Sequence, residues 1–252
     1  MSRIPSDSNW KRPLVFPAVN MAYVFASHLL GLVDPRATFV LNDPRGLVNA
    51  NEKLYALNFP SVIPESLVTA DATRLKAFMD ALGGEMIVKP LAGCGGSGVL
   101  HLHRADRNLN ALLELSTVEG RRLVMAQRYL PAARDGDKRL IVLDGEPLGA
   151  ILRVPREDEH RGNIHVGGQV RKSPVDDRDR EICRVLGPRL RQDGLYFVGL
   201  DIIGGFVTEV NVTSPTGVQE IDRLDGTCLE ARVLDFVETR AATLDRAGAP
   251  GA

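Results

Sequence analysis

The chain has 252 residues, enough to bury a sizeable core in one domain without disulfide or metal crosslinks. Hydrophobic residues make up 44% and charged residues 25%, which excludes a disordered, collagen-like or disulfide-scaffold chain. The 31 lysines and arginines are balanced by 32 aspartates and glutamates, so the net charge of −1 provides no basic field for nucleic acid. We therefore expect no nucleic-acid partner.

The composition also predicts a cytoplasmic protein. Its three cysteines are too few and too scattered for a disulfide framework or a zinc site, which favours a reducing compartment. The N-terminal residues lack the basic-then-apolar pattern of a secretion signal. The most apolar early stretch, residues 21–33, is interrupted by polar residues and glycine and is too short to cross a bilayer. No membrane segment is expected.

The first half of the chain is predicted to combine helices with short strands. Residues 1–19 have no clear periodicity and are expected to be extended or loop, and residues 42–46 carry a turn signal. Helices are predicted at 19–32, 49–57, 71–82 (with Thr69 as the cap) and 106–116. Strands are predicted at 37–41, 85–91, 99–103 and 123–128.

The second half is predicted to contain two β-hairpins. One pairs 139–143 with 146–154 about Asp144–Gly145, and the other pairs 195–203 with 206–212 about Gly204–Gly205. The remaining elements are a long polar loop at 155–172, helices at 175–192, 217–224 and 227–241, and a flexible tail at 247–252. Helices mixed with antiparallel hairpins predict an α+β fold rather than a doubly wound parallel sheet.

A glycine-rich segment, residues 93–98, follows the predicted strand 85–91. Its sequence GCGGSG matches the dinucleotide pattern G-x-G-x-x-G, but that motif requires a helix to begin there. The next residues, 99–103, alternate between apolar and polar and predict a strand, and no Gly-Lys-Ser/Thr forms a Walker loop. A glycine-rich hairpin beside Lys89 can cradle phosphate with its backbone N–H groups. The alternative is a mobile surface hairpin with an incidental lysine.

Acidic residues mark the second hairpin. Asp201 interrupts an apolar strand, while Glu209 and Asn211 lie two residues apart on the returning strand and share one face. The Gly204–Gly205 turn places Asp201 across from that pair, and carboxylate and amide oxygens are ligands that suit Mg²⁺. The alternative is a solvent-exposed face of a half-buried hairpin. Together with Lys89 and the glycine-rich segment, these residues outline a Mg-ATP site of neither the P-loop nor the protein-kinase type.

Several further stretches extend this pattern: 51–54, 88–91 with Gly93 and 95–96, 125–131, 135–139, 161–163 with 167–168, 198–204 and 208–216. In these stretches the chain resembles the ATP-grasp superfamily and, more narrowly, the bacterial glutathione synthetases, over about residues 50 to 240. The resemblance implies two α+β subdomains that grip ATP between antiparallel sheets. It divides the chain into an ATP-grasp domain at 51–245, a flexible tail at 246–252, and a segment at 1–50.

The segment 1–50 is expected to be a shortened remnant of the domain that this family carries ahead of the ATP-grasp part. The pocket for the acyl substrate is then open, completed by a second chain, or remodelled, and a homo-oligomer is expected. The partners implied are a small-molecule acid and an amine.

The resemblance also implies a role for each matching position. Residues expected to bind ATP are Lys53, Lys89, Gly93, Gly95, Gly96, Ser97, Gly98, Gln127, Arg128, Tyr129, Leu130 and Asp137. Residues expected to face the carboxylate and acyl phosphate are Arg139, Arg153, Arg161 and Asn163. Those expected to border the amine are Ser214, Pro215, Thr216 and Gly217, while Asp201, Glu209 and Asn211 would hold Mg²⁺.

The implied activity is ATP- and Mg²⁺-dependent ligation of a carboxylate to an amine through an acyl phosphate, as in the joining of γ-glutamylcysteine to glycine. Two alternatives stay open: a divergent ligase with another small acid and amine, and a non-catalytic ATP-binding module. Outside this pattern, His101 and His103 share one face of a predicted strand. Two histidines alone do not make a metal site, so a polar face beside solvent is expected.

Overall fold

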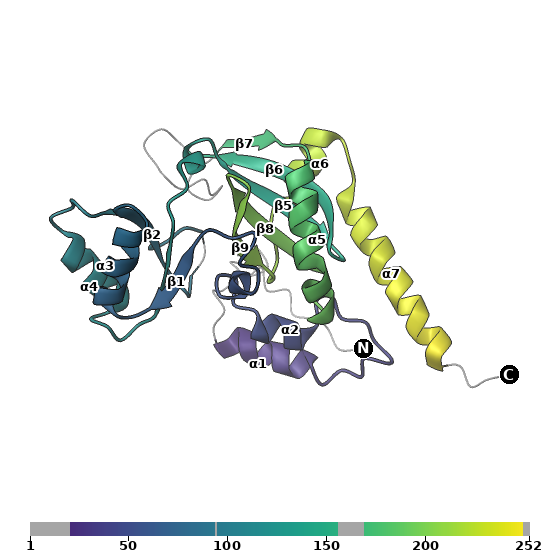
Figure 1. Ribbon diagram of the computed structural model, residues 1–252. Coiled ribbons are helices and arrows are strands. Elements are labelled where there is room, and N and C mark those ends of the chain that lie inside the picture. Colours follow the sequence, from purple (N-terminus) through teal and green to yellow (C-terminus); the bar gives the residue numbers. More distant parts are fainter. Residues whose placement is uncertain (1–20, 94, 156–168, 249–252) are drawn as a thin grey trace, which may run out of the picture.

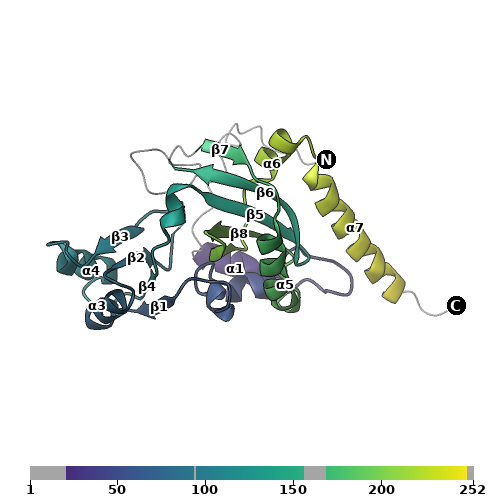
Figure 2. The same ribbon diagram turned by 45° about the horizontal axis from the view of Figure 1, so that its top comes forward.

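The computed structural model describes residues 21–93, 95–155 and 169–248. These residues form two lobes that lie side by side in both views of Figures 1 and 2, each built on an antiparallel sheet. The α+β class and the two antiparallel sheets predicted from the sequence are confirmed. Every helix within the described residues is either too short or too polar to span a lipid bilayer.

The small lobe contains a four-stranded sheet in the order β1-β4-β2-β3. Its elements are β1 (Ser66–Thr69), α3 (Ala72–Ala81), β2 (Glu85–Pro90), β3 (Leu100–His103), α4 (Leu109–Thr117) and β4 (Val124–Gln127). Met86 and Leu102 pack with Leu75 of α3 and Leu113 of α4 in a single core. Because side chains alternate along a strand, Glu85 and Lys89 lie on the opposite face, away from this core.

The large lobe contains a five-stranded sheet in the order β7-β6-β5-β8-β9. Its strands are β5 (Asp137–Leu143), β6 (Glu146–Val154), β7 (Gln169–Lys172), β8 (Phe197–Ile203) and β9 (Phe206–Asn211). Leu140 packs with α5 (Asp177–Gln192) on one face, whereas Ile141 packs with α6 (Val218–Asp225) and α7 (Leu229–Gly248) on the other. Asp137 and Arg139 alternate with Leu140, so they lie on the face opposite α5.

The segment before the small lobe packs against the large lobe. It forms α1 (Met21–Leu30), α2 (Pro44–Asn49) and the short 3-10 helix η2 (Tyr55–Asn58). Tyr55 and Phe59 belong to the same buried core as Leu186 of α5. The boundary predicted at residues 50 and 51 stays a prediction, because these contacts do not mark a domain border.

Some predicted elements are wrong. Residues 37–41 form no strand. Phe39 instead packs its ring on Tyr196 and Phe236, with centroids 5.7 and 5.9 Å apart. The helix predicted at 49–57 is replaced by α2 and η2, because Asp43 accepts a hydrogen bond from the Arg45 N–H and begins a helix at Pro44.

Other parts of the prediction also differ from the structure. Asp71, not Thr69, caps α3, since its carboxylate accepts from the N–H groups of Thr73 and Arg74. Residues 66–69 and 169–172 form strands that were not predicted, the second of them inside the expected loop 155–172. α7 continues to Gly248, beyond the predicted end at 241 and into the expected tail.

Candidate active site

Two buried lysines connect the lobes. Lys89, at the end of β2 and 5% exposed, donates from Nζ to the carbonyl oxygen of Thr208 on β9 at 2.9 Å. Lys53, 4% exposed, donates to the carbonyl oxygen of Gly93 at 3.1 Å and lies 3.4 Å from Glu209 Oε1. Each lysine is therefore held between a strand or loop of the small lobe and the large lobe.

The charge on Lys89 is costly where it lies. Burial lowers the pKa of Lys89, although the neighbouring Glu209 opposes the shift. A buried ammonium that accepts this cost needs an anionic partner. A phosphate placed between the lobes would supply one.

A network of arginines and aspartates covers the face of the large sheet opposite α5. Arg139 on β5 lies directly across from Asp201 on β8, and its Nε is 2.5 Å from Asp201 Oδ1. Arg153 on β6 reaches the other oxygen of Asp201 at 3.0 Å and also donates to the carboxylate of Asp137. All four side chains come from β5, β6 and β8, and the side chains of Arg139, Arg153 and Asp201 are at most 8% exposed.

The pKa values of the two aspartates of this network are shifted in opposite directions. Burial alone would raise the pKa of Asp201, but Arg139 and Arg153 hold it well below its usual range. Burial, and next the negative charge of Asp201, raise the pKa of Asp137 to about 7. One aspartate is thus firmly ionised, while its neighbour takes up a proton near neutral pH.

Three buried polar atoms in this region have no hydrogen-bond partner among the described residues: Asp137 Oδ1, Arg153 Nε and Asn211 Nδ2. Buried polar groups are usually paired, so such a group is explained by a ligand, an ion or water. Their grouping on one face of the large sheet marks the place where a polar ligand would bind.

The residues predicted to hold Mg²⁺ come together as expected on β8 and β9. Asp201 lies opposite Glu209, and Gly199 lies opposite Asn211. The side chain of Glu209 is 24% exposed and that of Asp201 8%, so Glu209 is the more accessible carboxylate.

Glu52 is a further acidic residue near Glu209, and the sequence analysis assigned it no role. It accepts a hydrogen bond from Thr213 Oγ1 at 3.1 Å, and its backbone oxygen accepts from Val210 N–H at 2.9 Å. Burial, and next the charge of Glu209, raise the pKa of Glu52. Its position directly before Lys53 was the available signal.

The glycine-rich segment forms the connection between β2 and β3, as predicted. Gly93, Gly95, Gly96 and Gly98 all have positive φ, between 69° and 103°. At Gly98 a Cβ would also lie 3.2 Å from the ring of Pro90, so a larger residue would strain the turn. Ser97, in the same turn, is exposed.

The residues predicted to contact adenine lie at the end of β4 and just beyond it. Gln127 is buried and donates to Ser66 Oγ at 2.9 Å, while Arg128 forms an exposed ion pair with Glu65 at 2.6 Å. Tyr129 stacks on His101 with ring centroids 3.8 Å apart. Leu130 leads into the 3-10 helix η3 (Pro131–Arg134). The Arg128 side chain pairs with Glu65 at the surface and its N–H donates to the Glu65 carbonyl oxygen, so its own carbonyl oxygen remains for the predicted role.

The segment predicted to border the amine follows β9 and contacts Arg139. The carbonyl oxygen of Thr216 accepts from Arg139 Nη1 at 3.1 Å. Gly217 has a φ of 125°, and a Cβ there would lie 3.3 Å from Arg139 Cγ. Ser214 and Pro215 precede this contact in the chain, and Ser214 has a positive φ of 102°. Arg161 and Asn163 lie outside the described residues.

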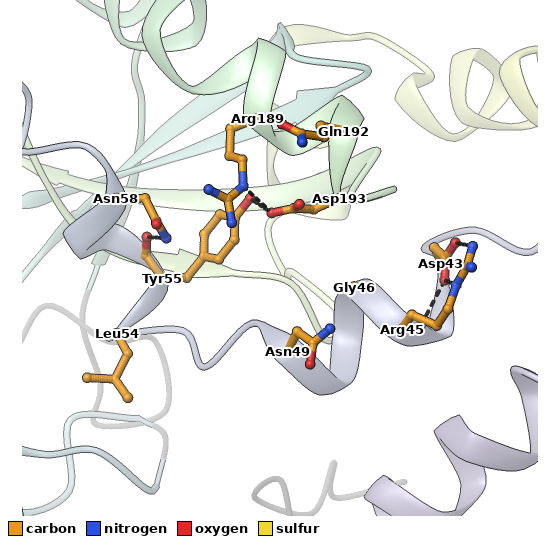
Figure 3. Close-up of a pocket in the computed structure, with 10 residues that line it drawn as sticks. All are labelled: Asp43, Arg45, Gly46, Asn49, Leu54, Tyr55, Asn58, Arg189, Gln192 and Asp193. Atoms are coloured by element: carbon orange, nitrogen blue, oxygen red, sulfur yellow. Dashed lines mark hydrogen bonds and ion pairs between the residues drawn. The ribbon is translucent and has the colours of Figure 1, made fainter.

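A separate pocket of about 580 Å³ lies between α2, η2 and the C-terminal end of α5 (Figure 3). Its lining includes Tyr55 and Arg189, which both contact Asp193, at 2.8 and 2.6 Å. None of the residues predicted for the nucleotide or substrate site lines it. The predicted site is therefore distinct from this pocket.

The family model and the similar curated proteins identify the same protein family. The family model described as prokaryotic glutathione synthetase, ATP-grasp domain, matches residues 52–226. A glutathione synthetase of Thermosynechococcus vestitus is 57% identical over 221 residues, which cover 88% of this chain and 69% of the relative. Those of Gloeobacter violaceus and Brucella melitensis are 55% and 47% identical, over 92% and 89% of this chain and 72% and 71% of the relative.

Solved structures share the fold at low sequence identity. The ATP-grasp ligase PsnB complexed with a minimal precursor matches with a TM-score of 0.64 and 23% identity, over 86% of this chain and 69% of that chain. D-alanine–D-alanine ligase from Bacillus anthracis complexed with ATP matches with a TM-score of 0.55 and 15% identity, over 83% and 70%. These likenesses confirm the predicted ATP-grasp fold.

Proposed function

The chain belongs to the prokaryotic glutathione synthetase family, and we propose that it joins γ-glutamylcysteine to glycine at the expense of ATP, with Mg²⁺ bound between its lobes. It is an ATP-grasp carbon–nitrogen ligase, as its relatives are. The observation that carries the choice of site is a pair of buried lysines that reach across the lobes in opposite directions. Lys53, beside Glu209, donates to Gly93 of the small lobe, and Lys89 of the small lobe donates to Thr208 of the large lobe.

Nucleotide binding at this site is supported by charge. Lys89 and Lys53 would contact the phosphates of ATP, while the turn 93–98 would offer backbone N–H groups to them. Asp137 would lie near the ribose, and the strand end 127–130 would meet the adenine. Lys53 already donates to Gly93 of this turn, and Lys89 already donates to Thr208 of β9, so both elements lie next to these cations.

The donor set fits Mg²⁺. Asp201, Glu209 and Asn211 supply hard oxygen ligands from adjacent strands, and Glu209 retains the more accessible carboxylate. Bound there, Mg²⁺ would neutralise phosphate charge during transfer. Both oxygens of Asp201 also accept from arginines, so we expect metal affinity to depend most on Glu209.

The acid and the amine would meet beside Arg139 and Arg153. The carboxylate would attack the γ-phosphorus of ATP and ADP would leave. The amine would then attack the acyl phosphate and release inorganic phosphate. Arginine N–H groups, including the Nε of Arg153, which has no hydrogen-bond partner among the described residues, would hold the negative oxygens. Residues 214–217, together with Arg161 and Asn163, would complete the substrate site.

The test is ADP formation by the whole chain with ATP and Mg²⁺, in a matrix of acids and amines. The acids are γ-glutamyl dipeptides and unrelated small acids, and the amines are glycine, other amino acids and simple amines. We expect ADP only when acid and amine are both present, with the highest rate for γ-glutamylcysteine and glycine. The Lys89→Ala variant, purified in parallel, controls for contaminating ATPase.

Other outcomes separate the alternatives. A faster rate with a different acid and amine identifies a divergent ligase. ATP binding without ADP formation on any combination identifies a non-catalytic module. The predicted homo-oligomer is tested independently by sedimentation, where a single protomer mass would contradict it.

A further inference from the structure

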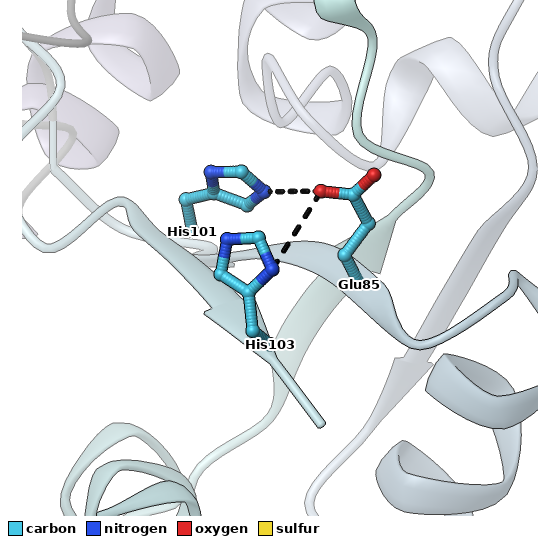
Figure 4. A group of neighbouring side chains, drawn as sticks. All are labelled: Glu85, His101 and His103. Atoms are coloured by element: carbon cyan, nitrogen blue, oxygen red, sulfur yellow. Dashed lines mark hydrogen bonds and ion pairs between the residues drawn. The ribbon is translucent and has the colours of Figure 1, made fainter. Parts of the chain in front are cut away.

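We propose that Glu85, His101 and His103 form a binding site for a divalent transition-metal ion such as Zn²⁺, separate from the Mg²⁺ site between the lobes. The two histidines alone predicted only a polar surface. The structure adds a third ligand from the neighbouring strand. Figure 4 shows the three side chains converging, with both imidazole rings directed at the Glu85 carboxylate.

The strand register brings these side chains together. Glu85 on β2 lies directly opposite His103 on β3, and His101 lies two residues before His103 on the same face. His101 Nε2 is 2.9 Å and His103 Nδ1 is 3.8 Å from Glu85 Oε2. One ligand atom from each side chain lies within 4.8 Å of the other two.

These separations suit a metal ion. A tetrahedral Zn²⁺ with bonds of about 2.0–2.1 Å holds its ligand atoms roughly 3.3 Å apart. The distances of 2.9 and 3.8 Å bracket that value, so rotation of the side chains within the same backbone would complete the geometry. Because the histidines lie on a paired strand, the backbone needs no rearrangement.

The chemistry of the ligands selects the class of ion. Two imidazoles and one carboxylate suit Zn²⁺, Co²⁺ or Ni²⁺, whereas Mg²⁺ prefers oxygen ligands alone. Two histidines and a glutamate also leave a fourth position for water or an external ligand. The selectivity of this set is therefore opposite to that of Asp201, Glu209 and Asn211.

The surroundings orient the ligands and leave them accessible. His101 is held by stacking on Tyr129, with centroids 3.8 Å apart and planes 19° apart. The side chains of His103 and Glu85 are 57% and 40% exposed, so an ion can enter from solvent. A simpler explanation of the cluster is a hydrogen bond between Glu85 and His101 at the exposed edge of the sheet, with no metal ion involved. Metal binding distinguishes the two.

The site lies on the same face of the small sheet as Lys89. His101 is opposite Ile87, and Ile87 is opposite Gln127 on the next strand, so the proposed ion would lie beside the surface assigned to the nucleotide. Binding should nevertheless occur without ATP, because every proposed ligand belongs to β2 or β3. The experiment is accordingly done in the absence of nucleotide.

The test is titration of the untagged whole chain with Zn²⁺ by calorimetry at neutral pH, with Mg²⁺ in excess. The variants are His101→Gln and His103→Gln. The matched control is His28→Gln, an exposed histidine on α1. Loss of an outer-shell partner already weakens metal binding by about 10–100-fold, so loss of a direct ligand should weaken it at least tenfold. His28→Gln should bind like the unmodified chain.

Two further readouts keep the test decisive. Zn²⁺ should raise the unfolding temperature of the unmodified chain and of His28→Gln, and should raise that of His103→Gln less at the same Zn²⁺ concentration. Co²⁺ should give the intense visible absorption of a four-coordinate site, which Zn²⁺ then abolishes. The proposal is overturned if Zn²⁺ does not bind, or if His103→Gln, whose side chain is mostly exposed and free of the Tyr129 stack, binds it as tightly as the control.

Discussion

At the scale of single residues, the site is defined by charges that are buried at a cost. Lys89 is 5% exposed, burial lowers its pKa, and its ammonium donates to a neutral carbonyl oxygen. Such an arrangement is explained when the residue serves an anionic ligand.

Lys89→Ala should weaken ATP binding by about 10–100-fold, since a hydrogen bond to a charged group contributes about 1.5–3 kcal/mol. AMP binding should change little, because we expect Lys89 to contact the phosphates beyond the α position, which AMP lacks. Calorimetry with both nucleotides measures the difference. Lys76→Ala, on the helix α3 that covers the opposite face of the sheet, is the control. Equal losses for ATP and AMP would refute the phosphate role.

Glu209→Gln should abolish ligation while weak ATP binding persists. The amide keeps the shape of the side chain but removes the charge that would neutralise Mg²⁺. Turnover is measured across a Mg²⁺ titration beside Glu114→Gln, an exposed substitution on α4 that should behave like the unmodified chain. If Glu209→Gln retains a near-normal rate at limiting Mg²⁺, the metal assignment is wrong.

Asp137 should make stability depend on pH. Its folded pKa is raised to about 7 by burial and Asp201, whereas an unfolded aspartate titrates near pH 4, so the folded state binds the proton more tightly. Its stabilising contribution is therefore complete below the unfolded pKa and is lost as pH rises from about 4 to about 7.

Denaturant unfolding of the chain and of Asp137→Asn across that range measures the effect. As the pH rises, the unfolding free energy of the unmodified chain should fall relative to that of Asp137→Asn by up to about 1.4 kcal/mol per pH unit. Parallel curves for the two proteins would show that Asp137 does not titrate in this window.

At the scale of elements, the hairpins were the most predictable part of the fold. Asp144–Gly145 and Gly204–Gly205 are turn sequences, and the structure has them at the two tight turns of the large sheet. The Gly204–Gly205 turn also sets the register that places Asp201 opposite Glu209. Residue type and strand alternation were sufficient for this part of the site.

Contacts that depend on sheet order were not predictable in the same way. Arg153 reaches Asp201 only because β6 and β8 both flank β5, and local periodicity does not specify that order. The approach of Glu85 to the two histidines likewise depends on the β2–β3 register. The strand wrongly predicted at 37–41 has a related cause, since Phe39 packs against Tyr196 and Phe236 and the segment joins neither sheet.

The glycine-rich turn 93–98 should become ordered when ATP binds. Glycines at positive φ leave the backbone entropically free, and phosphate contacts would offset the cost of ordering it. Hydrogen exchange with and without a non-hydrolysable ATP analogue should show protection of this turn only with nucleotide, while α4, on the opposite face of the small sheet, serves as the internal control. Strong protection already present in the nucleotide-free chain would indicate a structural turn instead.

At the scale of the whole molecule, the described residues of the two lobes meet through polar contacts rather than a shared core. Lys89 donates to Thr208, Lys53 to Gly93, and Asn51 to the carbonyl oxygen of Leu91 at 3.0 Å. Their apolar cores are separate clusters. A ligand between the lobes can therefore replace hydrogen bonds without disrupting either core, as ligation between two gripping lobes requires.

The central claim, ligation through an acyl phosphate in this site, is tested most directly by following oxygen-18 from the carboxylate of the acid. The carboxylate oxygen that attacks the γ-phosphorus stays with phosphate when the amine displaces it. Mass spectrometry should therefore find one oxygen-18 in each inorganic phosphate formed from γ-glutamylcysteine labelled in its cysteinyl carboxylate, in step with the peptide product. Phosphate formed in step with the product but free of label would contradict the account.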